Sequence, residues 1–90
     1  MEYEFTIIAA GGTTNPCRFI LDKKGYKLFI QEGDDIARYH IAVKGERRFV
    51  GHSAPEVLGL VTMWEEMGDD WHDKLSGLPD IIPEEIAPDE

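Results

Sequence analysis

The sequence predicts an α+β fold: an antiparallel meander sheet of about five strands, with one main α-helix packed on one face and a loose acidic C-terminal tail. Two observations predict it. Before residue 52 the apolar residues alternate with a period of two, which is typical of strands; after Ser53 they recur at helical spacing. A chain of 90 residues suffices for one small core. We therefore expect a single domain over residues 1–83 and a flexible acidic tail over residues 84–90.

Five segments are expected to form the sheet. In four of them every second residue is apolar, and these residues are Tyr3, Phe5, Ile7 and Ala9; Cys17, Phe19 and Leu21; Tyr26, Leu28 and Ile30; and Tyr39, Ile41 and Val43. One face of a sheet accounts for all of them. A fifth, shorter segment at 46–50 carries Arg47 and Arg48, and such charges suit an edge strand because they discourage pairing with other chains.

Glycines mark the expected connections between neighbouring antiparallel strands. Residues 22–25 predict a short hairpin loop with Gly25 in the left-handed conformation, and Lys44–Gly45 predicts a two-residue turn. Residues 11–16 are expected to form a loose loop, and residues 31–35 another turn.

A helix is predicted to begin directly after Ser53. The run from Ser53 to Glu56 fits a capping box, in which the serine hydroxyl accepts from the glutamate amide and Pro55 sits in the first turn. Gly68 is expected to end this helix. Its apolar stripe should cover the sheet, and it consists of Val57, Leu60, Val61, a largely buried Trp64, and Met67. Beyond it, residues 69–75 are expected to add a short helical turn that folds Trp71 and Leu75 back onto the body.

The charge is unevenly distributed along the chain. The net charge is −9; residues 1–52 hold seven acids and eight bases, whereas residues 53–90 hold eleven acids and only Lys74 as a base. Because nucleic-acid affinity depends on Lys and Arg contacts to phosphate, direct binding of DNA or RNA is not expected. The single Cys17 indicates a reducing compartment, and no apolar run is long enough to span a membrane. We expect a cytoplasmic protein without a membrane partner.

No catalytic residue, metal site or cofactor is predicted. Ser53 lacks the nucleophile-elbow pattern and is better explained as a helix cap, and Cys17 alternates with apolar residues, as a buried structural thiol would. The acids and histidine of the segment 69–73 include metal-binding side chains but match no established metal-site spacing.

The acidic end of the predicted helix is the candidate site. Acids are unfavourable at a helix C-terminus, where the partial charge is negative, so helix stability alone does not explain them. Three explanations remain open: solubility, docking on a basic partner, and internal pairing with Arg47 and Arg48. The predicted partner-binding residues are Glu65, Glu66, Asp69, Asp70, Trp71 and Asp73.

The leading functional hypothesis is a small acidic, non-enzymatic binding protein that docks on a basic surface of a partner protein, as inhibitors and immunity proteins do. One alternative is a small ligand-binding module or enzyme that uses the open sheet face, where Thr6, Arg18, Lys27, Phe29 and His40 are expected to gather. Another is a homo-oligomer whose contact on that face includes Ile8, Ile20 and Phe29.

Overall fold

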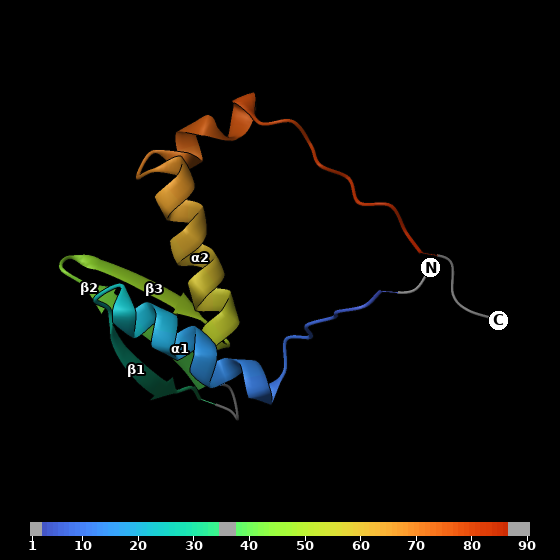
Figure 1. The fold of residues 1–90 in the computed structure, drawn as a ribbon. Helices are drawn as coiled ribbons and strands as arrows, with labels where there is room; N and C mark the ends of the chain where they lie inside the picture. The colour runs from blue at the N-terminus through green and yellow to red at the C-terminus, as the bar shows by residue number, and fades with distance from the viewer. Residues whose placement is uncertain (1–2, 35–37, 87–90) are drawn as a thin grey trace.

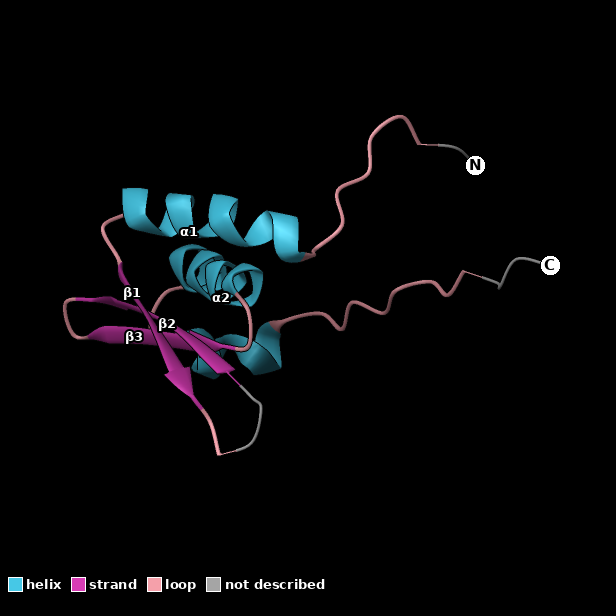
Figure 2. Ribbon diagram, turned by 90° about the horizontal axis from the view of Figure 1, so that it is seen from below, coloured by secondary structure: helices cyan, strands magenta, loops and turns pink. Residues whose placement is uncertain are grey.

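The sheet and the two main helices form two layers. The computed structural model describes residues 3–34 and 38–86. In chain order its elements are the 3-10 helix η1 (Gly11–Thr13), α1 (Thr14–Lys23), β1 (Lys27–Glu32), β2 (Arg38–Lys44), β3 (Arg47–Gly51), α2 (Ala54–Met67) and the 3-10 helix η2 (Trp71–Gly77). The strands are antiparallel in the order β1-β2-β3, and both α-helices lie on the same face of the sheet (Figures 1 and 2).

The α+β class is correct, but the prediction of about five strands is wrong: within the described residues the sheet has three. Residues 17–21, expected as a strand, lie in α1. Leu21 is buried, Cys17 is half-buried and Phe19 is exposed, so burial follows helical spacing and not the alternation that was expected. Pro16 in the first turn is the local signal for this helix start, because a proline there removes no intrahelical hydrogen bond.

A Schellman motif ends α1. The Gly25 amide donates to the Asp22 carbonyl at 2.9 Å, and the Tyr26 amide donates to the Leu21 carbonyl at 3.1 Å. Gly25 has a φ of 96°, so its left-handed conformation was predicted correctly, although it follows a helix and not a strand. The side chains of Leu21 and Tyr26 are both in the core, which is the apolar contact that often accompanies this motif.

The N-terminal segment, residues 3–9, is extended but pairs with no strand of the described sheet. Its alternating apolar side chains are exposed, and it runs away from the body of the molecule (Figure 1). The strand expected here is therefore not formed. The alternation makes the segment compatible with a strand, but a strand needs a neighbour to satisfy its backbone groups.

The orientation of β2 differs from the prediction. Ala42 pairs with Leu28 on β1 and with Phe49 on β3, and these three residues face the helices. Because side chains alternate along a strand, Tyr39, Ile41 and Val43 therefore point to the opposite, open face. The prediction had placed them in the core. Ala42 is fully buried, and its small side chain leaves room for a helix to pack closely over the middle of the sheet.

The hairpin between β2 and β3 closes one residue later than expected. Lys44 pairs with Arg47, so the two-residue loop is Gly45–Glu46, with Gly45 at a φ of 62°. The other expected turn, residues 31–35, extends into residue 35, which lies outside the described residues.

The predicted start and end of α2 are observed. The Ser53 hydroxyl accepts a hydrogen bond from the Glu56 amide at 3.3 Å, and the helix ends at Gly68, whose φ is 90°. Val57 and Val61 are fully buried and form the core with Leu21, Tyr26 and Ala42. Trp64 was predicted to be largely buried but is only half-buried; its ring packs against Phe49 and the Arg47 guanidinium, both of β3.

No helix within the described ranges is long and apolar enough to cross a membrane. The C-terminal segment after η2, residues 78–86, is extended and exposed, and it leads away from the body as the N-terminal segment does (Figure 1). Of the tail expected at 84–90, residues 87–90 lie outside the described residues.

Candidate functional site

The predicted partner-binding residues lie at one end of the molecule. Glu65 and Glu66 are in the last turn of α2, Asp69 and Asp70 are in the link that follows, and Trp71 and Asp73 are in η2. The acids are exposed and Trp71 is half-buried. The structure therefore brings all six residues to the same end, where α2 turns into η2.

Asp69 is the centre of a small network at this end. Its carboxylate forms an ion pair with Arg47 and accepts a hydrogen bond from Trp64 Nε1 at 2.6 Å. The Arg47 guanidinium lies over the Trp64 ring at 4.4 Å from its centroid. The hydrogen bonds from Arg47 and then Trp64 hold the pKa of Asp69 below its ordinary value, and the bond to Asp69 raises the pKa of Arg47.

Two more acids of this end are paired with lysines. Lys24, from the end of α1, contacts both carboxylate oxygens of Glu65 at 3.1 Å. Lys74 lies 3.3 Å from Asp70 and also donates to the Met67 carbonyl at 2.6 Å, at the end of α2. Lys24, which is distant in sequence, and Lys74, which is near, thus offset the unfavourable charge at the helix C-terminus.

Internal pairing accounts for only part of the acidic cluster. It involves Arg47, as one explanation proposed, but Arg48 points to the open face and forms no ion pair with a described residue. Glu66 and Asp73 form no ion pair within residues 3–34 and 38–86 either. In this part of the chain, no three acidic, histidine or cysteine side chains are grouped so that they could hold a metal ion.

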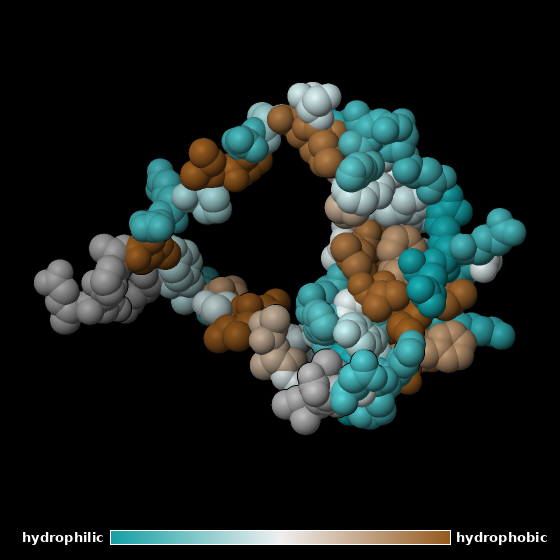
Figure 3. All heavy atoms as spheres, turned by 180° about the vertical axis from the view of Figure 1, so that it is seen from behind, coloured by the Kyte–Doolittle hydropathy of each residue, from teal (hydrophilic) through white to brown (hydrophobic). Residues whose placement is uncertain are grey.

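The sequence analysis did not single out the exposed apolar residues of the segment 78–86. Only residues 84–90 were expected to form a tail, and residues 78–83 were assigned to the domain. The whole segment 78–86 is exposed, and so are its isoleucines: Ile81 and Ile82 at 82% and Ile86 at 91%. Figure 3 shows brown, hydrophobic side chains along both extended ends of the chain, outside the body. The signal was available in the sequence, since Ile81 and Ile82 stand side by side between two prolines and among acids.

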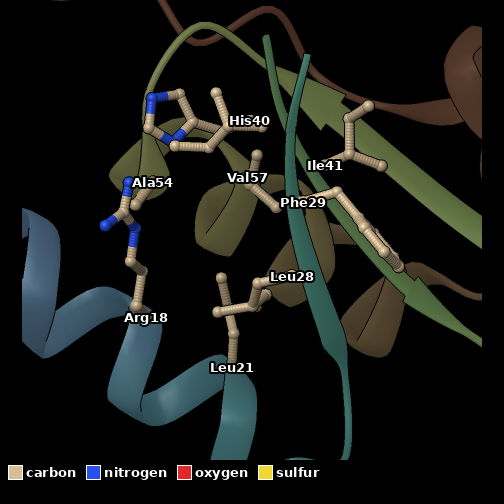
Figure 4. Close-up of a pocket in the computed structure, with 9 residues that line it drawn as sticks. Arg18, Leu21, Leu28, Phe29, His40, Ile41, Ala54 and Val57 are labelled. Carbon is tan, nitrogen blue, oxygen red and sulfur yellow. The ribbon is translucent and has the colours of Figure 1, made fainter.

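A pocket of about 250 Å³ lies between α1, the sheet and the start of α2. Arg18 and His40 both line it (Figure 4). These two residues were expected to meet on the open sheet face, and they do come together, but on the helix side. Burial, followed by the nearby charges of Arg18 and Arg38, lowers the pKa of His40, while Glu56 opposes this shift.

The other residues assigned to the open face are dispersed. Lys27 and Phe29 are on that face, whereas Thr6 is in the extended N-terminal segment. The three residues of the expected oligomer contact also separate, because Ile8 is in that segment and Ile20 is on α1. The row that does cross the open face is Phe29, Ile41 and Val50.

Ser53 and His52 are placed in structural roles. The Ser53 hydroxyl accepts from the Glu56 amide and lies 3.3 Å from Oε2 of the same residue, so it caps α2. The His52 ring packs against Tyr39, with 5.2 Å between the ring centroids.

Comparison of the chain with protein-family models, curated proteins and solved structures finds no match.

Proposed function

We propose that this protein is a small, non-enzymatic binding protein that docks on a basic surface of a partner protein through its acidic C-terminal region. We define this region as the end of α2, η2 and the segment 78–86. We further propose that it acts in the cytoplasm, which agrees with Cys17 being a free thiol.

One observation carries the proposal: highly exposed isoleucines are interspersed with carboxylates that form no ion pair in the described part of the chain. Ile81, Ile82 and Ile86 project from the segment that also holds Asp80, Glu84 and Glu85. These three acids, like Glu66 and Asp73, form no ion pair with any residue in the described ranges. Solubility explains exposed acids, but it does not explain exposed isoleucines beside them.

The two kinds of side chain supply different parts of an interaction. Burying one isoleucine on a partner removes apolar surface from water and is worth roughly 1.5–3 kcal/mol before ordering costs are subtracted. Carboxylates contribute less affinity in water, but they accelerate encounter with a positively charged surface and disfavour acidic surfaces. The matching partner therefore presents Lys and Arg around an apolar groove.

The internal ion pairs decide which acids to alter in a test. Asp69 and Asp70 contact Arg47 and Lys74, so neutralising them would disturb the fold as well as any interface. A better variant combines Glu66→Gln, Asp73→Asn and Glu85→Gln, because these acids have no ion pair to lose among the described residues. Its matched control removes three exposed acids from the body, and these substitutions are Asp22→Asn, Asp34→Asn and Glu46→Gln.

The experiment captures partners on the immobilised full-length chain from an extract of its host, and then measures association kinetics of the captured protein at low and high salt. We expect the C-terminal variant to associate more slowly and with a weaker salt dependence than the parent, while the control variant behaves like the parent. Equal association by all three proteins would contradict acidic docking. Failure to capture any basic protein at low salt would contradict the proposed function as a whole.

A further inference from the structure

The pocket beside α1 is separate from the acidic C-terminal region and is built from four elements. Leu21 of α1, Leu28 of β1 and Val57 of α2 form its apolar inner wall, as Figure 4 shows. Ala54, at the start of α2, limits it on one side. The side chain of Phe29 points to the other face of the sheet, so the interior is formed mainly by the helix-facing residues (Figure 4).

Two nitrogen-bearing side chains converge at this apolar pocket. Arg18 extends from α1 towards His40 on β2 (Figure 4). Among the described residues Arg18 forms no ion pair, and none of the residues that line the pocket is acidic. In a chain with a net charge of −9, the pocket is therefore a locally positive site.

The charges around His40 indicate that an anion would be favoured in the pocket. Burial, and then the charges of Arg18 on α1 and Arg38 on β2, disfavour a proton on the imidazole, and Glu56 on α2 is the acid that opposes them. An anion bound between Arg18 and His40 would compensate the charge of Arg18, and it would raise the pKa of His40. A neutral apolar molecule would fill the space without this compensation.

We propose that the pocket binds a small monocarboxylate with an apolar body. The planar guanidinium of Arg18 matches a carboxylate in a two-point hydrogen bond, and His40 supplies a third donor. Leu21, Leu28, Ile30 and Val57 would surround the hydrocarbon part. The volume of about 250 Å³ lies just below the range of roughly 300–1,000 Å³ that is typical of ligand pockets, so the pocket suits only a small acid.

The test uses octanoate as the probe, with octanol and octylamine as controls that keep the chain and change the head group. Binding to the full-length protein is measured by titration calorimetry, and its location by amide chemical-shift changes in NMR spectra. We expect saturable binding of octanoate, with shifts centred on Leu21, Leu28 and Val57, and weaker binding of both controls. Octanol binding as tightly as octanoate, or no saturable binding of octanoate, would overturn the proposal.

Arginine variants test the proposed contact. Arg18→Met should weaken octanoate binding by at least about tenfold, the effect of one lost charge-assisted hydrogen bond. Arg18→Lys keeps the charge and should bind with intermediate affinity. Arg48→Met, which makes the same change on the open face, should bind like the parent and serves as the matched control. Equal affinity for all four proteins would overturn the assignment of Arg18.

The pH dependence tests His40 and does not require a change at Arg18. Because a bound anion raises the pKa of His40, octanoate should bind more tightly as pH falls through the raised pKa of the complex. This gain should level off below the pKa of His40 in the free protein, which is lowered from 6.5. A His40→Gln variant should lose this dependence and still bind octanoate through Arg18. If octyl phosphate bound more tightly than octanoate, the pocket would favour a phosphate over a carboxylate. This result would contradict the proposed ligand class.

Discussion

The body of the molecule and its two extended ends use similar apolar residues in different ways. In the body, Leu21 and Val57 are 1% exposed and Val61 is completely buried between the helices and the sheet. In the ends, Ile7 is 89% exposed and Ile82 is 82% exposed. Apolar content alone therefore does not say which segments fold together.

The difference lies in what each apolar residue has beside it. Leu21 is buried because α1 ends in a Schellman motif that brings Tyr26 back onto it. In the C-terminal segment, prolines and acids flank Ile81 and Ile82. This segment forms neither a regular helix nor a paired strand, so it has no regular apolar face that could pack on the body. Apolar residues that the chain leaves exposed in this way are the ones we assign to a partner.

The largest expected effect contrasts one buried and one exposed side chain. Leu21→Ala should lower the free energy of unfolding by about 2–5 kcal/mol, because it removes packed atoms and leaves a cavity. Ile7→Ala should change it by no more than about 0.5 kcal/mol. Urea unfolding followed by circular dichroism measures both. Similar losses in the two variants would mean that the N-terminal segment packs on the body.

A smaller effect is expected where α1 meets β1. Gly25→Ala should cost about 1–2 kcal/mol, since an L-residue is strained at a φ of 96°. Gly77→Ala is the control, because Gly77 has no positive φ and open space around it. If the melting temperatures of the two variants fell equally, the turn after α1 would not have the conformation described.

Removal of the helix cap should have a similar or slightly smaller effect. Ser53→Ala should lower the free energy of unfolding by about 0.5–2 kcal/mol, because the Glu56 amide loses its acceptor. Ser53→Asn, which can also cap, should restore most of this stability. A variant with unchanged stability would show that the cap does not contribute, and Ser53 would then need another explanation.

The smallest effect concerns pH and the network at the end of α2. Folding depresses the pKa of Asp69 below its ordinary value of 3.8, so its pairing stabilises the fold above that pH and is lost as pH falls through the lower, folded pKa. Asp69→Asn should therefore weaken the dependence of stability on pH in this acidic range. Parallel stability curves for parent and variant between neutral pH and acid would contradict the pairing with Arg47.

The sequence was sufficient to predict the positions of α2 and of the strands nearest to it. Ser53, Pro55 and Gly68 mark the ends of that helix chemically, and Gly45 marks the last hairpin, so local rules found these elements to within about a residue or two. Residues 17–21 were misassigned because five residues are too few to separate a period of two from helical spacing when Leu21 fits both.

Three features depended on contacts that a single sequence does not reveal. The face of β2 was predicted wrongly because Ile41 and Val43 are larger and more apolar than Ala42, yet close packing of a helix favours the small residue. Of the five residues expected to gather on the open face, Arg18 and His40 line one pocket on the helix side, since their meeting depends on α1 being a helix. The acidic cluster was found from composition, whereas its pairing with Lys24 depends on tertiary structure.

The central claim is that the C-terminal segment does not belong to the core of the body and is free to engage a partner. The most direct test is the free energy of unfolding of a full-length variant that combines Ile81→Ser, Ile82→Ser and Ile86→Ser. Our account predicts a value within about 0.5 kcal/mol of the parent, because these side chains are exposed in the isolated protein. A loss of about 2 kcal/mol or more would place the isoleucines in the protein's own core and would contradict the claim.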